Sequence, residues 1–273
     1  MSASVRLERE DRIAFLTLSN PARKNAMTRS MWLALRAAFE SLAAGADGSA
    51  DARCVVVRGE GDAFCAGGDI SEYPDFRFDE ARLREFHESE VWGALAAMLA
   101  CELPLVAQIT GPCMGAGLEI ASCCDIRLAG ESASFGAPIA KLGFPMAPRE
   151  AALVHGAIGD TLARDMLLCA GVHDARRLYE AGFLLRVVPD AALAGEALAC
   201  ARRIAVLSPG AARLNKRTFA ALRQGPGAAD AQAADAGTDP RIAGLLPTAY
   251  DYADSAEHRE GITAFLAKRT PRF

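Results

Sequence analysis

The segment LPLVAQITGPCMGAGLEIASCCD, residues 103–125, carries the clearest structural signal in the chain. Its apolar start, residues 103–109, predicts a buried strand, the glycine-bearing residues that follow predict a loop, and LEIASC predicts a helix. The same order occurs upstream, where residues 53–58 predict a buried strand that runs into the loop GEGDAFCAGGD. Two such units in series predict a repeating α/β architecture.

The N-terminal part of the chain extends this pattern. Val5 and Leu7 alternate with charged residues and residues 13–18 are rich in β-formers, so a strand pair is expected to turn at residues 10–11. Thr28 can cap a helix whose apolar positions recur at helical spacing as far as Phe39. Between the two glycine loops, residues 79–100 predict a long amphipathic helix.

Beyond residue 150 the sequence is mostly helical in pattern. Asp160 is expected to cap one helix, and His173 with Asp174 to start another before a short strand at residues 184–188. A helix over residues 191–206 ends at a Ser-Pro-Gly sequence, where a second region is expected to begin. Residues 225–240 are rich in Gly, Ala and Asp and predict a loop or a frayed helix, and residues 255–268 predict a final helix.

The composition excludes several classes of protein. With 273 residues, 51% hydrophobic and 23% charged, the chain is expected to form one enzyme-sized globular core. Its formal net charge of -4 argues against nucleic acid as the main partner. The eight cysteines form no CxxC pair, which favours a reducing cytoplasm and predicts no zinc site. The most apolar stretch is interrupted by Glu102 and Pro104, so no membrane span is predicted.

Familiar catalytic and nucleotide-binding motifs are absent from the sequence. The sequence Gly-Ala-Gly at residues 115–117 lacks the third glycine of GxGxxG, since Ile120 stands there, and there is no GxxxxGK[ST], GxSxG or HExxH. The four histidines are scattered without metal-ligand spacing, and each is interpreted as a surface or core residue.

The two glycine loops are the strongest candidates for a ligand site. Each lies between a buried strand and a helix, where free backbone N–H groups gather. Gly68 lets a ligand approach the first loop, and Gly115 and Gly117 do the same in the second loop beside Glu119. Two N–H donors on one thioester or ketone oxygen would stabilise a developing enolate by about 3–4 kcal/mol per donor. The alternative interpretation is that both loops are tight turns that need glycine conformations.

Five motifs in series carry a resemblance to a known family: NPARKNA (20–26), FCAGGDI (64–70), GPCMGAGLEIASCCD (111–125), FGAPIAKLG (135–143) and EGITAFLAKR (260–269). Each motif is weak alone, but together, in this order and over nearly the whole chain, they resemble the crotonase family of enoyl-CoA hydratases and isomerases.

This resemblance implies an α/β fold, a spiral of repeated ββα units with a C-terminal helical trimerisation region. Residues 1–206 are then expected to form the spiral core with the acyl-CoA site, and residues 207–273 the helical oligomerisation region of a homotrimer or a dimer of trimers. The substrate would be an acyl-CoA thioester of fatty acid metabolism in the cytoplasm. No cofactor is expected other than the coenzyme A that the substrate carries.

The resemblance also implies residue roles. It places the oxyanion-binding amides at Gly68 and Ala116 and a catalytic carboxylate at Glu119, whose apolar surroundings in sequence should raise its pKa. The implied coenzyme A or substrate contacts, the last two often in a neighbouring subunit, are Arg23, Lys24, Ala26, Ala66, Gly68, Asp69, Ile70, Ser71, Ala116, Phe265 and Lys268. For the two lysines a solvated surface side chain is an equally good interpretation.

The sequence departs from the family pattern at the second carboxylate. Hydratases carry a glutamate directly after the proline in the stretch matching residues 135–143, but this chain has Ile139 there. Some isomerases place an aspartate where this chain has Ala147. Glu150 is the nearest remaining carboxylate, and it is interpreted either as a replacement acid or base or as an ordinary first-turn glutamate favoured by the helix dipole.

The leading functional hypothesis is hydration of a 2-enoyl-CoA, with Glu119 activating water while Gly68 and Ala116 hold the thioester oxygen. Double-bond isomerisation needs only one carboxylate and is the first alternative. Hydrolysis or decarboxylation of an acyl-CoA would use the same oxyanion site. An acyl-CoA-binding protein with impaired turnover is the alternative that Ile139 and Ala147 favour.

Overall fold

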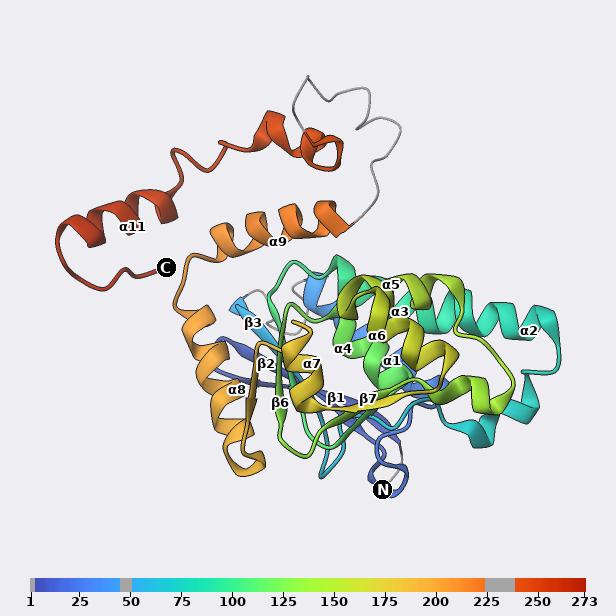
Figure 1. Ribbon diagram of the computed structural model, residues 1–273. Coiled ribbons are helices and arrows are strands. Elements are labelled where there is room, and N and C mark those ends of the chain that lie inside the picture. Colours follow the sequence, from blue (N-terminus) through green and yellow to red (C-terminus); the bar gives the residue numbers. More distant parts are fainter. Residues whose placement is uncertain (1–2, 45–50, 224–238) are drawn as a thin grey trace.

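Two β-sheets and the helices that cover them form the core of the computed structural model, which describes residues 3–44, 51–223 and 239–273 (Figure 1). The larger sheet has the spatial order β1 (Ser4–Glu10), β2 (Ile13–Ser19), β3 (Cys54–Gly59), β4 (Leu105–Ile109), β6 (Ile126–Gly130) and β9 (Arg186–Val188). The smaller sheet contains β5 (Pro112–Met114), β7 (Ser134–Gly136) and β8 (Val172–Asp174). The predicted strands therefore all lie in the larger sheet.

The larger sheet is covered on both faces, which explains its long apolar strands. After the antiparallel β1–β2 pair, the neighbours pair in parallel from β2 to β9. Leu16 and Leu18 pack into the core that contains α1, whereas Ile13 and Phe15 pack into a separate cluster with α8. All seven residues of β2 are buried, because side chains on both faces of the strand enter an apolar core.

The helices follow the predicted order. They are α1 (Arg29–Ala44), α2 (Glu80–Glu85), α3 (Trp92–Ala100), α4 (Ala116–Cys123), α5 (Pro148–Ile158), α6 (Asp160–Leu168), α7 (Ala175–Glu180), α8 (Asp190–Ala205), α9 (Pro209–Arg223) and α11 (Ala256–Leu266). The shorter 3-10 segments are η1 (Pro21–Arg23), η3 (Ile70–Asp75), η5 (Pro138–Leu142) and η6 (Pro240–Thr248). Thr28 caps α1 as expected, since its Oγ1 accepts a hydrogen bond of 3.2 Å from the amide of Met31.

Two local predictions need refinement. The long helix predicted over residues 79–100 contains a π-helical segment, η4 (Phe86–Val91), between α2 and α3. The prediction that Asp160 caps a helix is wrong: Gly159 occupies the cap position with φ +84°, and the Asp160 side chain instead pairs with Arg164 and His155. Asp174 does cap α7, accepting a hydrogen bond of 2.8 Å from the amide of Arg177.

Successive turns of the chain stack on one another, as in a spiral. After β4 and β6 the chain passes directly into β5 and β7, which pair in parallel in the smaller sheet. Single bridges continue this stack to earlier turns, between Cys113 and Cys65 and between Gly68 and Met27. This stacking brings the two glycine loops side by side and is the feature of the fold that positions the candidate site.

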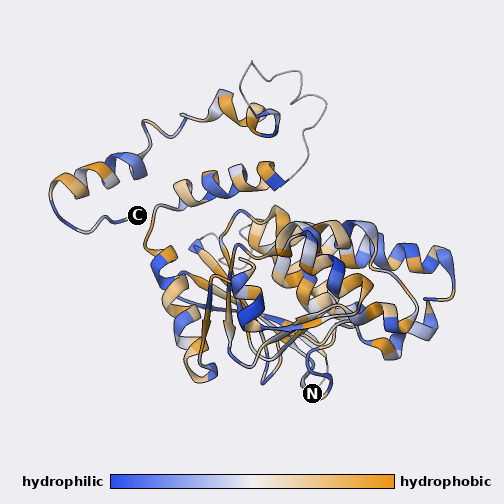
Figure 2. Ribbon diagram, viewed as in Figure 1, coloured by the Kyte–Doolittle hydropathy of each residue, from blue (hydrophilic) through white to orange (hydrophobic). Residues whose placement is uncertain are grey.

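The C-terminal segment leaves the core after α8 (Figure 1). Lys216 on α9 ties it back, since its ammonium group lies 2.6 Å from the carbonyl oxygen of Leu103 and 2.8 Å from Oδ2 of Asp125. In contrast, α11 lies clear of both sheets and carries hydrophobic residues that no part of the core covers (Figure 2). Most of residues 225–240, predicted as a loop or frayed helix, lies outside the described residues. The division into regions at residue 206 stays a prediction.

Candidate active site

A short backbone bridge joins the two glycine loops. The amide of Cys65 donates to the carbonyl of Pro112 at 3.0 Å, and the amide of Met114 donates to the carbonyl of Cys65 at 2.8 Å. Cys65 is thereby paired with Cys113. Gly68 and Ala116 each follow a member of this pair by three residues. The two predicted oxyanion donors, the amides of Gly68 and Ala116, therefore lie at equivalent positions after the Cys65–Cys113 bridge, in adjacent turns of the spiral.

Among the described residues, neither predicted donor amide has a backbone hydrogen-bond acceptor. Ala116 is the first residue of α4, where an amide has no intrahelical acceptor. No hydrogen bond among the described residues uses the amide of Gly68. The close approach of the loops requires glycine at residue 117, since a Cβ there would lie 2.5 Å from the carbonyl oxygen of Cys65. Gly115 has φ +45°, in the left-handed region that favours glycine.

Glu119 lies in the first turn of α4, three residues beyond Ala116. It is 8% exposed, and no hydrogen bond to its carboxylate is found among the described residues. Burial, followed by the negative charge of Glu150, raises the pKa of Glu119 to about 8. The direction agrees with the expectation from its apolar sequence, and the side chain can hold a proton near neutral pH.

Glu150 lies in the first turn of α5, which packs against α4. It is 2% exposed, and its Oε1 lies 3.1 Å from Nδ1 of His87. His87 belongs to the π-helical segment η4, which a second ion pair, Arg149 with Glu88 at 2.8 Å, holds against the start of α5. Glu150 is therefore a buried, paired carboxylate and not a solvated first-turn glutamate.

An aromatic cluster lies against the first glycine loop. A Cβ at Gly68 would lie 2.2 Å from the hydroxyl of Tyr73, so this hydroxyl contacts the glycine backbone. The ring of Tyr73 packs edge-on against Phe76 and Phe144, with centroid distances of 5.8 and 6.0 Å. Burial raises the pKa of Tyr73, the positive charge of Arg77 opposes this shift, and the negative charge of Glu119 adds to it. Tyr73 therefore contacts the first glycine loop and carries a hydroxyl group whose burial favours its neutral form.

The predicted coenzyme A segment and the first glycine loop lie together. Residues 23–27 run beside residues 66–69, with the amide of Ala66 donating to the carbonyl of Lys24 at 2.9 Å. Arg23 Nη1 lies 2.9 Å from Oδ1 of Asp69, and the same oxygen accepts from the Ser71 hydroxyl at 2.6 Å. Seven of the predicted contact residues are thereby grouped: Arg23, Lys24, Ala26, Ala66, Gly68, Asp69 and Ser71. Ile70 is adjacent and 52% exposed.

Other predicted positions lie elsewhere. Phe265 is 82% exposed in α11, and α11, with Lys268 just beyond its end, lies clear of both sheets in this single chain (Figure 1). Ile139 lies in η5 and Ala147 immediately precedes α5, and neither supplies a titratable group. Of the three positions considered for a second carboxylate, 139, 147 and 150, only Glu150 supplies one.

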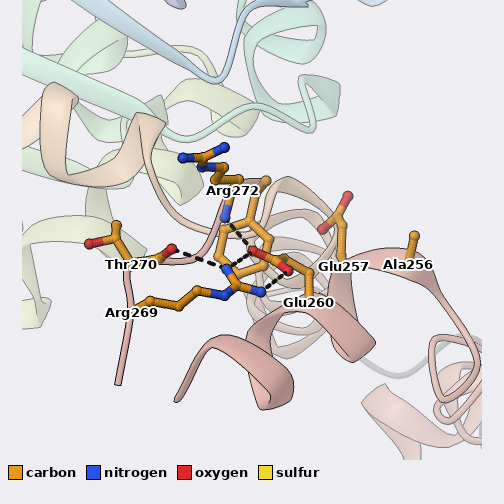
Figure 3. Close-up of a pocket in the computed structure, with 7 residues that line it drawn as sticks. Ala256, Glu257, Glu260, Arg269, Thr270 and Arg272 are labelled. Atoms are coloured by element: carbon orange, nitrogen blue, oxygen red, sulfur yellow. Dashed lines mark hydrogen bonds and ion pairs between the residues drawn. The ribbon is translucent and has the colours of Figure 1, made fainter. Parts of the chain in front are cut away.

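A surface cavity of about 950 Å³ lies away from this site, between α11 and the C-terminal residues (Figure 3). Glu260 points into it and pairs with Arg269, whose hydrogen bonds lower the pKa of Glu260 to about 2. None of its lining residues is a catalytic candidate. Within residues 3–44, 51–223 and 239–273 there is no cluster of metal-ligating side chains and no helix that could span a membrane.

Sequence reasoning missed His87, Tyr73 and the arginine that stacks on the Tyr73 ring, Arg77. His87 had been interpreted as an ordinary surface or core histidine, because no motif surrounds it and its partner Glu150 is 63 residues away in sequence.

Comparison with known proteins gives a consistent result. The family model described as Enoyl-CoA hydratase/isomerase matches residues 8–273. A protein of Mycobacterium bovis named "Probable enoyl-CoA hydratase echA8" is 31% identical over 270 residues, covering 99% of this chain and 97% of that protein. The 2,3-dehydroadipyl-CoA hydratase of Escherichia coli is 32% identical over 268 residues, covering 98% of this chain and 97% of that protein.

The fold has close structural relatives. The crystal structure of an enoyl-CoA hydratase/carnithine racemase from Magnetospirillum magneticum has a TM-score of 0.87 and 36% identity, covering 100% of this chain and 96% of that one. The expected α/β spiral is thereby confirmed, while the trimerisation of its C-terminal region stays a prediction.

Proposed function

Because the chain belongs to the enoyl-CoA hydratase/isomerase family, we propose that it adds water across the double bond of a 2-enoyl-CoA. One observation carries the choice of hydration: two buried carboxylates, Glu119 and Glu150, lie in the first turns of α4 and α5, two helices that pack against each other. A hydratase needs one group to take a proton from water and another to give a proton to carbon.

The thioester oxygen binds between the amides of Gly68 and Ala116. As hydroxide adds to the β-carbon, negative charge moves onto this oxygen, and the two N–H groups stabilise it. The free amide at the start of α4 and its counterpart in the neighbouring turn support this role. Removal of one such donor typically costs about 2.7–4 kcal/mol.

The carboxylate pair holds one proton near neutral pH. The environment keeps Glu119 protonated, and the charge of Glu150 contributes to this effect. The ionised carboxylate accepts a proton from water as its oxygen bonds to the β-carbon. The protonated one gives its proton to the α-carbon as the enolate collapses to the thioester. One water is consumed, and transfer of one proton between the two carboxyl groups restores the pair. In this account Glu119 acts as the acid, and water activation, first assigned to Glu119, passes to Glu150.

Glu150 thus replaces the second glutamate that hydratases carry at the position of Ile139. It approaches from α5 and not from the stretch after β7. His87 supports it with a hydrogen bond at 3.1 Å, so the buried carboxylate is not left without a partner.

A second copy of the chain completes the binding site in our proposal. Ile262, Phe265 and Leu266 on α11 are 54%, 82% and 76% exposed, and such a stripe requires cover in water. Packing of α11 on a neighbouring subunit would cover this stripe and bring Phe265 and Lys268 to the coenzyme A bound there. The grouping of Arg23 and Asp69 supports a coenzyme A path along the first glycine loop.

The test is turnover of crotonyl-CoA by the wild-type protein and by Glu119→Gln, with the product identified by mass. We expect 3-hydroxybutyryl-CoA from the wild type and a rate at least about 100-fold lower from the variant. A shifted double bond or free coenzyme A in place of the hydroxyacyl product would assign isomerase or hydrolase activity instead. Tight binding without any product would support a binding protein.

A further inference from the structure

Arg77 packs against two aromatic rings beside the candidate site. Its guanidinium carbon is 3.6 Å from the centroid of the Phe144 ring and 4.5 Å from the centroid of the Tyr73 ring. Phe144 follows η5, and Tyr73 and Arg77 come from the segment after the first glycine loop. The planes of the two rings differ by 70°, so the guanidinium group lies in the corner that they form, where its N–H groups can still donate to a ligand.

This guanidinium group has no anionic partner within the described residues. It takes part in no ion pair and in no side-chain hydrogen bond there, whereas nearby Arg84 pairs with the carboxylate of Glu80 and Arg82 donates to the backbone carbonyl of Asp75. Burial lowers the pKa of Arg77, and no carboxylate offsets that effect. A partly buried cation without a counter-ion is unfavourable, and an anionic ligand would remove this cost.

Arg77 lies beside residues that would surround the acyl part of the substrate in the proposed reaction. Arg77 packs against the ring of Tyr73, whose hydroxyl contacts Gly68. The negative charge of Glu119 contributes to the raised pKa of Tyr73. The reacting carbons must lie between Gly68 and Glu119 in the proposed reaction. The coenzyme A segment has its own cations, Arg23 and Lys24, on a different part of the chain. Arg77 is therefore available to a group on the acyl chain.

We propose that Arg77 binds a carboxylate carried by the acyl chain, so that the preferred substrates are 2-enoyl-CoA thioesters of dicarboxylic acids. The guanidinium group would donate two parallel hydrogen bonds to the carboxylate while contacts with the two rings restrict its movement. This inference rests on the proposed function, and it adds the substrate class to it.

Binding tests the inference without any turnover. The Kd values of adipyl-CoA and hexanoyl-CoA, which share chain length and differ in the terminal carboxylate, are measured by calorimetry for the wild type, Arg77→Met and Arg84→Met. We expect the wild type and Arg84→Met to prefer adipyl-CoA, and Arg77→Met to lose about 10- to 100-fold of that preference. Arg84→Met removes an exposed positive charge from the same segment and serves as the control.

Two results would overturn the inference. Equal affinity of the wild type for both thioesters would show that Arg77 does not contact an acyl carboxylate. An equal loss of affinity for both in Arg77→Met would show that the guanidinium binds a phosphate of coenzyme A or only supports the fold.

Turnover of 2,3-dehydroadipyl-CoA and 2-hexenoyl-CoA separates this inference from the proposed function. Hydration of both at the same kcat/KM would retain the function and reject the role of Arg77. Absence of hydration with a retained preference for adipyl-CoA in binding would reject the function and retain the anion site.

Discussion

His87 Nδ1 lies 3.1 Å from Oε1 of Glu150, a glutamate that is only 2% exposed. His87 is half-buried on the π-helical segment η4, and the extra residue in a π-helical turn changes the direction in which side chains leave the helix. A buried carboxylate is tolerated when a polar group supports it. The hydrogen bond with His87 on η4 therefore explains how a second carboxylate can stay buried at the start of α5, beside α4.

Replacing His87 should reduce catalysis more than stability. His87→Phe keeps an aromatic ring beside Phe86 but removes the one side-chain hydrogen bond to Glu150 found among the described residues. We expect kcat to fall by about tenfold with little change in KM, and the pH dependence of kcat to shift. His155→Phe, at an exposed histidine, is the matched control. An unchanged pH profile in His87→Phe would mean that the histidine only fills space.

Removing the amide at residue 116 should slow the chemical step. Ala116→Pro eliminates one proposed oxyanion donor, and the first position of a helix is where proline is tolerated. We expect kcat to fall by about 10²- to 10³-fold, with the folded state checked by circular dichroism and thermal unfolding. Normal turnover by this folded variant would exclude the amide as a donor.

The raised pKa of Glu119 predicts how stability changes with pH. A carboxyl group with a pKa of about 8 in the folded state, against an ordinary value of 4.5, binds more protons when the protein is folded. Its stabilising contribution is complete below about pH 4.5 and is lost as the pH rises to about 8. Glu119→Gln should therefore gain stability relative to the wild type between these pH values. Urea unfolding across the range checks this, and a constant difference would contradict the raised pKa.

Lys216 should anchor the C-terminal helices to the core. Its ammonium group is buried and bonds both the carbonyl of Leu103 and the carboxylate of Asp125. Lys216→Met leaves these acceptors without that donor, and we expect the free energy of unfolding to fall by about 1–3 kcal/mol. Arg217→Met, at a half-exposed ion pair with Glu102, should change it by less than about 1 kcal/mol. Equal effects in a denaturant titration would reject this role of Lys216.

The sequence predicts most of the fold because its strongest signals are local. The apolar run before the second glycine loop becomes β4, and the cap at Thr28 starts α1. The sequence predicts Asp160 as the cap of α6, but the cap is Gly159, whose positive φ starts the helix one residue earlier than expected. The π-helical segment leaves no periodicity that differs from an ordinary helix over so short a span.

The site was less predictable because its second half depends on long-range packing. Gly68, Ala116 and Glu119 lie in glycine-rich motifs that the sequence displays directly. By contrast, His87 meets Glu150 only because η4 lies beside α5. Arg77 likewise acquires its setting from Phe144, which is 67 residues away in sequence.

The central claim is that Glu119 and Glu150 act as one carboxylate pair in hydration. The direct test is the steady-state hydration of crotonyl-CoA by the wild type, Glu119→Gln, Glu150→Gln and the double variant, with Glu180→Gln, at an exposed ion pair on α7, as the control. We expect each single variant to lose at least about 100-fold in kcat, and the double variant to be little slower than either, because the two groups work as a unit. Turnover by Glu150→Gln at the wild-type rate would contradict the account.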